Sequence, residues 1–155
     1  MTSTQRVRFL ITSDTHGMTL NSDLPAALRL PTPETDVLLH CGKLTADCSS
    51  EELRRAAKLL QSVLAELRLI IAGNHDTLLD REFRLIHEGR LEEHEEALNI
   101  LKQAEAVTYL EEGTHRSTLR NGATFSVYAS PYTTFAVWST VRPPCLPIPV
   151  PCRPI

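Results

Sequence analysis

The sequence predicts an α/β (α+β layered) domain in which a parallel sheet comes first and an antiparallel hairpin follows. Three short apolar runs are separated by segments long enough to cross over between parallel strands. Each run ends in a turn that carries polar side chains. Later, two alternating segments flank Asn121-Gly122, a dipeptide typical of a two-residue hairpin turn. A chain of 155 residues accommodates one such domain.

The composition excludes several classes of protein. Apolar residues make up 42% and charged residues 23%, as in ordinary globular domains. The net charge of −3 gives no basic footprint for nucleic acid. No apolar run approaches the ~20 residues of a membrane helix, and the N-terminal run is too short for a signal peptide. The four cysteines lack zinc-site spacing. Because no export signal is recognised, we expect reduced thiols and a cytoplasmic location.

The first half of the chain reads as strand, crossover, strand, helix, strand. A first strand is expected over residues 6–12, followed by a polar turn that ends at Gly17. Residues 21–33 contain three prolines, which predicts a surface loop. A second buried strand is expected over residues 36–41.

Ser49 lies three residues before Glu52, which is the spacing of a capping box at the start of a helix. Apolar residues from Leu53 to Leu67 fall on one face of that helix. The helix leads to a third buried strand over residues 69–72, which stops at Gly73.

The second half predicts helices over residues 79–86 and 91–103, then a strand over residues 107–110. The alternating segments 114–119 and 123–129 predict a hairpin that begins a second sheet. From Pro143 to Ile155, six of thirteen residues are proline. We therefore expect a partial domain over residues 1–133 and a proline-rich, disordered tail over residues 134–155.

Because parallel strands end at the same edge of a sheet, the three polar turns are expected to meet there. The candidate site residues in these turns are Asp14 and His16, then Lys43, then Asn74, His75 and Asp76. The first pair is either a half-site for Mn²⁺, Fe or Zn²⁺ or an Asx turn beside a solvated histidine. The last three either bind metal and move protons or form a polar turn in which Asn74 takes a positive φ and Asp76 caps a helix.

Taken together, the motifs resemble a known family. Asp14-Thr15-His16, residues 40–45 (HCGKLT) and residues 73–76 (GNHD) are similar, in order and spacing, to the first three motifs of the calcineurin-like metallophosphoesterases. Those motifs usually run DxH, GD followed by an apolar residue and T, and GNH[DE]. Residues 130–133 (SPYT) extend the resemblance to most of residues 6–133. The combination of motifs resembles most the small metallophosphoesterase-domain proteins of animals and their fungal relatives.

The resemblance implies a β-sandwich flanked by helices, here missing its C-terminal portion. It also implies a two-metal hydrolase that acts on phosphomonoesters or phosphodiesters of small molecules. Asp14 and His16 would hold one metal ion, Asn74 would hold the other, and a carboxylate would bridge both. His75 would protonate the leaving oxygen, and Asp76 would orient His75 by a hydrogen bond.

Lys43 stands where the family has the bridging aspartate. A charged ammonium has no lone pair for a metal ion. At a separation of ~5 Å and an effective dielectric constant of ~20, exchanging −1 for +1 beside a divalent ion costs on the order of 10 kcal/mol before screening. Two-metal occupancy is therefore expected to fail, and one metal ion or none is expected.

The family also takes ligands from histidine motifs further downstream, whereas no histidine follows His115. We expect His87, His94 and His115 to be solvated surface residues. Weak or absent hydrolysis is the expected result. Two alternatives stay open: a non-catalytic domain in which Lys43 binds a phosphate ligand as a point charge, and a truncated or misread gene product without activity.

Overall fold

The computed structural model describes residues 5–20, 24–88 and 91–131, apart from the side chains of residues 87 and 88. Its centre is a four-stranded parallel sheet in the order β1-β2-β3-β4. The strands are β1 (Phe9–Thr12), β2 (Val37–His40), β3 (Leu67–Ile70) and β4 (Val107–Tyr109). The predicted α/β architecture with consecutive parallel strands is thereby confirmed. The predicted tail over residues 134–155 lies outside the described residues.

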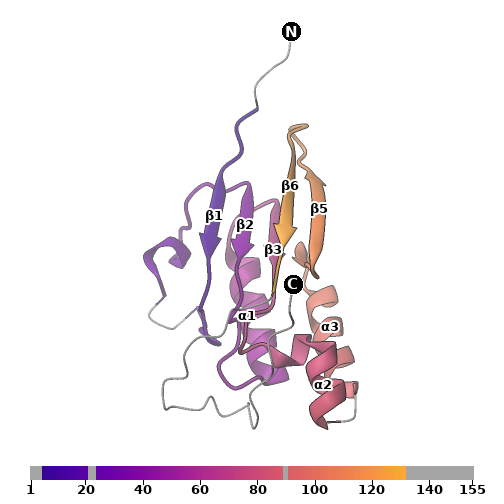
Figure 1. The fold of residues 1–155 in the computed structure, drawn as a ribbon. Helices are drawn as coiled ribbons and strands as arrows, with labels where there is room; N and C mark the ends of the chain where they lie inside the picture. Colours follow the sequence, from indigo (N-terminus) through magenta and orange to yellow (C-terminus); the bar gives the residue numbers. More distant parts are fainter. Residues whose placement is uncertain (1–4, 21–23, 89–90, 132–155) are drawn as a thin grey trace, which may run out of the picture.

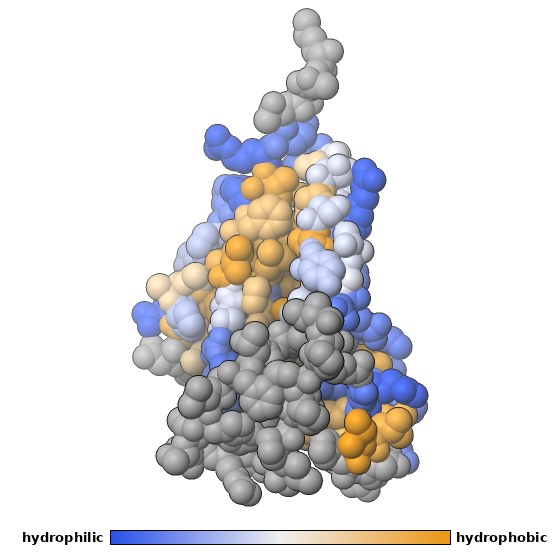
Figure 2. Space-filling view, in the orientation of Figure 1, coloured by the Kyte–Doolittle hydropathy of each residue, from blue (hydrophilic) through white to orange (hydrophobic). Residues whose placement is uncertain are grey.

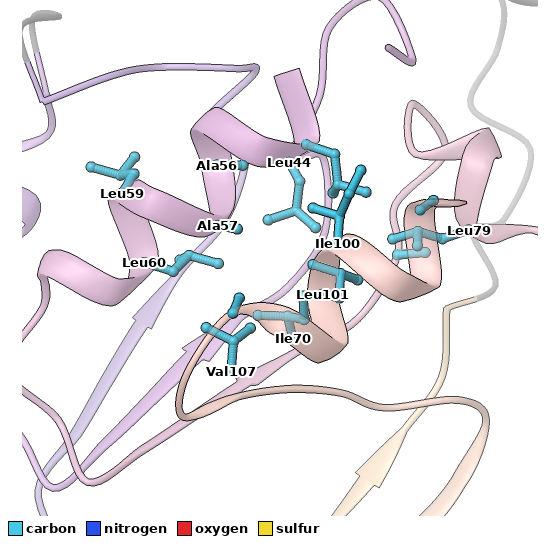
Figure 3. Packing of buried hydrophobic residues seen from close by; sticks show 14 of the residues in the cluster. Leu44, Ala56, Ala57, Leu59, Leu60, Ile70, Leu79, Ile100, Leu101 and Val107 are labelled. Carbon is cyan, nitrogen blue, oxygen red and sulfur yellow. The ribbon is translucent and has the colours of Figure 1, made fainter. Parts of the chain in front are cut away.

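Helices cover one face of this sheet. The helical elements are η1 (Ala26–Leu28), α1 (Ser50–Ser62), η2 (Thr77–Leu79), α2 (Arg81–Glu88) and α3 (Glu92–Gln103). In Figure 1, α1 lies behind the central strands, and α2 and α3 lie below the hairpin. Figure 3 shows Ala57 and Leu60 of α1 together with Leu101 of α3 and Ile70 of β3 in the main core.

A hairpin covers part of the opposite face. It consists of β5 (Gly113–Thr118) and β6 (Thr124–Ala129), paired antiparallel. Val37 and Leu69 of the parallel sheet and Ala129 of β6 share a second buried cluster. The domain is therefore layered as helices, parallel sheet and hairpin (Figure 1).

The hairpin turn differs from the two-residue type that Asn121-Gly122 predicted. Leu119 N donates to the carbonyl oxygen of Ala123 at 2.8 Å, which leaves three residues in the turn. Gly122 has φ +84°, and its N–H bonds to the carbonyl oxygen of Leu119, whereas Asn121 is not among the residues with positive φ. A type I turn closed by a glycine bulge has this form, since the two-residue type requires positive φ at both positions.

β1 is not the buried strand that its apolar sequence predicted. It is an edge strand of the sheet, and Phe9 and Ile11 are 42% and 65% exposed. The Phe9 ring packs edge-on against Phe125 of β6 at 5.2 Å between centroids, so the hairpin reaches β1 at this contact. Figure 2 shows apolar surface across the front of the sheet beside the hairpin. The apolar sequence correctly predicted a strand here. It did not indicate how much of that strand the other layers would cover.

Three further elements differ from the predictions. The predicted surface loop over residues 21–33 contains η1, in which Leu28 is fully buried in the core. The predicted helix over residues 49–67 ends at Ser62, and Leu64 is 74% exposed. β3 begins two residues earlier than predicted because it includes Arg68.

Arg68 occupies an interior strand position because its guanidinium caps the end of α1. Its Nε donates to the carbonyl oxygens of Leu60 and Val63 at 2.9 and 3.1 Å, and its Nη2 donates to that of Val63 at 2.6 Å. The last carbonyl groups of a helix have no partner within it, so these bonds satisfy groups that burial would otherwise leave unpaired. Burial lowers the pKa of Arg68.

Candidate functional site

The loops that follow β1, β2 and β3 meet at the carboxyl edge of the parallel sheet. Asp14 N donates to the carbonyl oxygen of Gly42 at 3.0 Å, and His16 N donates to that of Lys43 at 3.0 Å. Gly17 N continues the series with a 2.7 Å bond to the carbonyl oxygen of Leu44. The first two polar turns therefore run side by side, as the parallel arrangement predicted.

Three of the candidate residues hold a left-handed backbone conformation. Asp14, His16 and Lys43 have φ values of 58°, 43° and 56°. Such values are uncommon for residues with a side chain and persist where surrounding contacts impose them. Asn74, for which positive φ was one of the alternatives, is not among the residues with positive φ. The loop contacts thus fix how these three side chains leave the backbone.

Two glycines allow the second and third loops to touch. A Cβ on Gly42 would lie 2.7 Å from Gly73 Cα, and one on Gly73 would lie 2.4 Å from Lys43 N. Real Cβ atoms do not come this close, so both positions require glycine for space. The backbone of Lys43 is consequently held against the loop that carries Asn74, His75 and Asp76.

Asp76 fastens these two loops through its buried carboxylate. Oδ1 accepts hydrogen bonds from Thr45 N and Thr45 Oγ1, and Oδ2 accepts from Leu44 N and Gly73 N, all at 2.8–3.1 Å. Asp76 is 2% exposed. It is the N-cap residue of η2 but makes no side-chain capping bond there. Both oxygens are occupied by scaffold donors, in place of the hydrogen bond to His75 that was predicted.

Glu52 secures the next two residues of the same loop. Its Oε2 accepts hydrogen bonds from Ala46 N and Asp47 N, each at 2.8 Å. Ser49 Oγ caps α1 by accepting from Glu52 N at 3.2 Å, so only half of the predicted capping box is seen. Burial, and then the hydrogen bond with Asp47, raise the pKa of Glu52. Two buried carboxylates thus take all four backbone N–H groups of residues 44–47.

Lys43 forms an ion pair with Asp14. Lys43 Nζ lies 2.8 Å from Asp14 Oδ1, and His16 Nε2 lies 3.7 Å from the same oxygen. The hydrogen bond from Lys43, followed by one involving Ser13, holds the pKa of Asp14 below its ordinary value. The predicted proximity of the first two loops is thereby realised as a direct contact between side chains of opposite charge.

His75 faces His16 across the loops. Their rings meet edge to face at 5.1 Å between centroids. His75 Nδ1 lies 3.3 Å from the carbonyl oxygen of Ala46. Because a carbonyl can only accept, this contact places a proton on Nδ1 and leaves Nε2 as the atom available for chemistry. Asn74 precedes His75 in the same loop and is exposed.

His40 is a buried component of the site region that the sequence did not single out. It is 1% exposed, its Nε2 lies 3.0 Å from Thr15 Oγ1, and its Nδ1 has no hydrogen-bond partner. Burial lowers the pKa of His40 to about 4, against the opposing charges of Asp76 and Asp14. An imidazole in the last position of an apolar strand was the available signal.

The histidines outside the site do not all lie where predicted. His94 was expected to be solvated, but it is 7% exposed and its Nδ1 bonds to the carbonyl oxygen of Leu78 at 2.9 Å. This contact joins α3 to η2. His115 Nε2 bonds to the carbonyl oxygen of Glu111 at 2.8 Å on the hairpin. The side chain of His87 lies outside the described residues.

The residues present do not fit a two-metal centre. Over residues 5–20, 24–88 and 91–131, no three His, Cys, Asp or Glu side chains gather as metal ligands. The carboxylate oxygen that Asp14 would offer to a metal ion instead contacts an ammonium group. Lys43 also stands at the position of the expected bridging ligand and has no lone pair to donate. A second metal ion would need a bridging carboxylate at position 43, and the chain has a lysine there.

Comparison with known proteins agrees with the fold and the motifs. A sequence model of the calcineurin-like phosphoesterases matches residues 7–143. The chain belongs to the calcineurin-like phosphoesterase family. The match extends ten residues beyond the predicted domain end at Thr133. Proteins of this family generally use divalent metal ions, whereas a charged lysine at position 43 offers no lone pair to one.

Individual relatives match parts of the chain. Metallophosphoesterase domain-containing protein 1 of Homo sapiens and of Mus musculus are each 34% identical over 76 residues, which is 49% of this chain and 21% of the relative. A protein of Emericella nidulans named "probable rhamnogalacturonate lyase C" is 30% identical over 132 residues, 85% of this chain and 11% of that protein. The chain therefore spans about a fifth or less of the length of these relatives.

Proposed function

We propose that this chain is a metallophosphoesterase-family hydrolase domain directed at phosphate esters of small molecules, with weak or no turnover as it stands. The observation that carries the proposal is the convergence of Asp14, His16 and His75 from two loops at one sheet edge, inside a domain of this family. Open parallel sheets place ligand chemistry at this edge.

His75 is the proposed proton donor. Its Nδ1 contact with Ala46 leaves Nε2 to bind a proton and to deliver it to the leaving oxygen of an ester. Asp14, His16 and Asn74 occupy the ligand positions of the family motifs. Lys43 is the reason for weak or absent turnover, because it occupies the Asp14 carboxylate and supplies no bridging ligand.

The non-catalytic alternative, a domain that binds a phosphate ligand through Lys43, finds less support. The Lys43 charge is already paired with Asp14, whose carboxylate would repel an anion. The backbone N–H groups of residues 44–47, which could otherwise form an anion-binding loop, are donated to Asp76 and Glu52. A phosphate would have to displace contacts that are already made.

A reducing, cytoplasmic setting is part of the same proposal. The two cysteines in the described ranges, Cys41 and Cys48, are free thiols. Such thiols are typical of proteins kept in reducing compartments. Among these residues, no helix combines the length and the apolar composition that crossing a membrane requires.

The test is hydrolysis of a chromogenic phosphodiester, bis(p-nitrophenyl) phosphate, by the purified chain with Mn²⁺. We expect little product from the wild type and at least about tenfold more from Lys43→Asp, because the substitution removes the competing ammonium and adds a carboxylate. Adding His75→Asn to that variant should lower the rate about 100-fold through loss of the proton donor.

Lys58→Glu is the matched control, since Lys58 is exposed on α1 and its reversal changes the net charge equally. It should leave the rate at the wild-type level. A folded Lys43→Asp variant that binds Mn²⁺ and still releases no nitrophenol would overturn the proposed function.

A further inference from the structure

The Lys43 ammonium contacts the same carboxylate oxygen of Asp14 that lies beside His16. Lys43 Nζ is 2.8 Å from Asp14 Oδ1, and the same oxygen is 3.7 Å from His16 Nε2. We infer that Lys43 is a tethered cation that takes the place of a metal ion, so that this site assembles without divalent ions and excludes them. This inference rests on the proposed function, because it takes the active site to lie where that proposal puts it.

The backbone directs the Lys43 side chain to this place. Lys43 holds φ 56°, and its carbonyl oxygen accepts from His16 N at 3.0 Å. A Cβ on Gly73 would lie only 3.0 Å from Lys43 Cγ, so the lysine stem runs against Gly73. The following residue, Leu44, is fully buried in the main core and is labelled among its side chains in Figure 3. The backbone of Lys43, the contact of its Cγ with Gly73 and the burial of Leu44 together fix the direction in which the lysine side chain leaves the backbone.

The loops are also closed by contacts that require no metal ion. The carboxylate of Asp76 joins the second loop to the third through donors at Leu44, Thr45 and Gly73. Cys48 Sγ donates to the carbonyl oxygen of His75 at 2.6 Å, which ties the third loop to the second at another point. We therefore expect the loops to keep their arrangement in the presence of a chelator such as EDTA.

Exclusion of divalent ions follows from charge and from the ligand count. The ion pair itself is a weak barrier, because the Lys43 and Asp14 side chains are 37% and 47% exposed. A divalent ion at Asp14 and His16 would, however, remain within a few ångströms of a tethered positive charge. It would also find two ligands where the described part of the chain offers no group of three.

Lys43→Asp reverses both obstacles at once. The substitution removes the positive charge and adds a carboxylate beside Asp14 and His16. Aspartate also tolerates the left-handed conformation of this position better than lysine does, so the variant is expected to fold.

The experiment is Mn²⁺ binding, measured by calorimetry and by the electron paramagnetic resonance signal of free Mn²⁺, with no substrate present. We expect the wild type to bind no Mn²⁺ at a total concentration of about 1 mM, which means a Kd well above about 1 mM. Lys43→Asp should bind Mn²⁺ at least about 100-fold more tightly than the wild type. The melting temperature of the wild type should be the same in Mn²⁺ and in EDTA, whereas Mn²⁺ should raise that of Lys43→Asp.

Lys43→Met separates the two causes, since it removes the charge without adding a ligand. Its affinity for Mn²⁺ should fall between those of the wild type and Lys43→Asp. Wild-type binding as tight as that of Lys43→Asp would overturn the inference, as would a folded Lys43→Asp variant that gains no affinity. Gained Mn²⁺ affinity without hydrolysis would leave this inference standing and overturn the proposed function alone.

Discussion

Lowering the pH should destabilise this domain through His40. Burial lowers the pKa of His40 to about 4 in the folded chain, from an ordinary value of 6.5. The unfolded chain therefore binds a proton between these two values that the folded chain does not bind, so stability falls as the pH drops. The loss begins near pH 6.5 and is complete below pH 4.

The size of the effect follows from the shift. Each unit of pKa difference corresponds to about 1.4 kcal/mol, so the full loss is about 3.4 kcal/mol. At pH 5 the expected loss relative to pH 8 is about 2 kcal/mol. Asp14, Asp36 and Asp47 have lowered pKa values and stay ionised over this range in both states. Glu52 has a raised pKa and acts in the opposite direction, so a comparison with a His40 variant is needed.

The assay is urea unfolding followed by far-ultraviolet circular dichroism at pH 8 and pH 5. In His40→Gln, the amide can keep the contact with Thr15 Oγ1 but does not titrate. The difference in unfolding free energy between the two pH values should be about 2 kcal/mol smaller in this variant than in the wild type. Leu38→Val, on the same face of β2, should lower stability by about 1 kcal/mol equally at both pH values. An unchanged pH dependence in His40→Gln would refute the assignment.

Three substitutions test the contacts that build the scaffold, each by urea unfolding. Arg68→Met should cost about 2 kcal/mol by leaving carbonyl groups at the end of α1 unpaired, whereas Arg54→Met, at an exposed ion pair, should cost under about 0.5 kcal/mol. Gly73→Ala should cost about 2–3 kcal/mol because its Cβ would lie 2.4 Å from Lys43 N. Asp76→Asn should cost about 3 kcal/mol, since either orientation of the amide turns an NH₂ group toward at least one backbone N–H that the carboxylate had accepted.

The strands were predictable from the sequence because apolar runs, crossover segments and turns are local signals. They predicted three parallel strands, a further strand over residues 107–110 and a hairpin, and in the structure that further strand is β4, the fourth of the parallel sheet. Burial was less predictable, because it depends on which neighbours a segment meets. The apolar β1 lies at the edge of the sheet with Ile11 exposed, whereas Leu28, in a proline-rich segment, is fully buried. Arg68 hid the start of β3 because its partners are carbonyl groups of another element.

The candidate site was predictable at the level of which loops meet. Parallel strands bring Asp14, Lys43 and His75 to one edge whatever the details of the loops. The sequence could not indicate that Lys43 would pair with Asp14, since this depends on left-handed backbone at both residues. Nor could it reveal the burial of His94, which follows from the way α3 meets η2.

Asp76 shows why a family motif does not by itself assign a chemical role. Its carboxylate accepts four hydrogen bonds from Leu44, Thr45 and Gly73, and these bonds hold two loops together. Replacing Asp76 would therefore loosen the backbone that positions both Lys43 and His75, and lost activity would not distinguish chemistry from structure. His75 gives the cleaner test of proton transfer, because its side chain contacts only Ala46 and the His16 ring among the interactions described above, and the Asp76 bonds that fasten the loop stay when it is replaced.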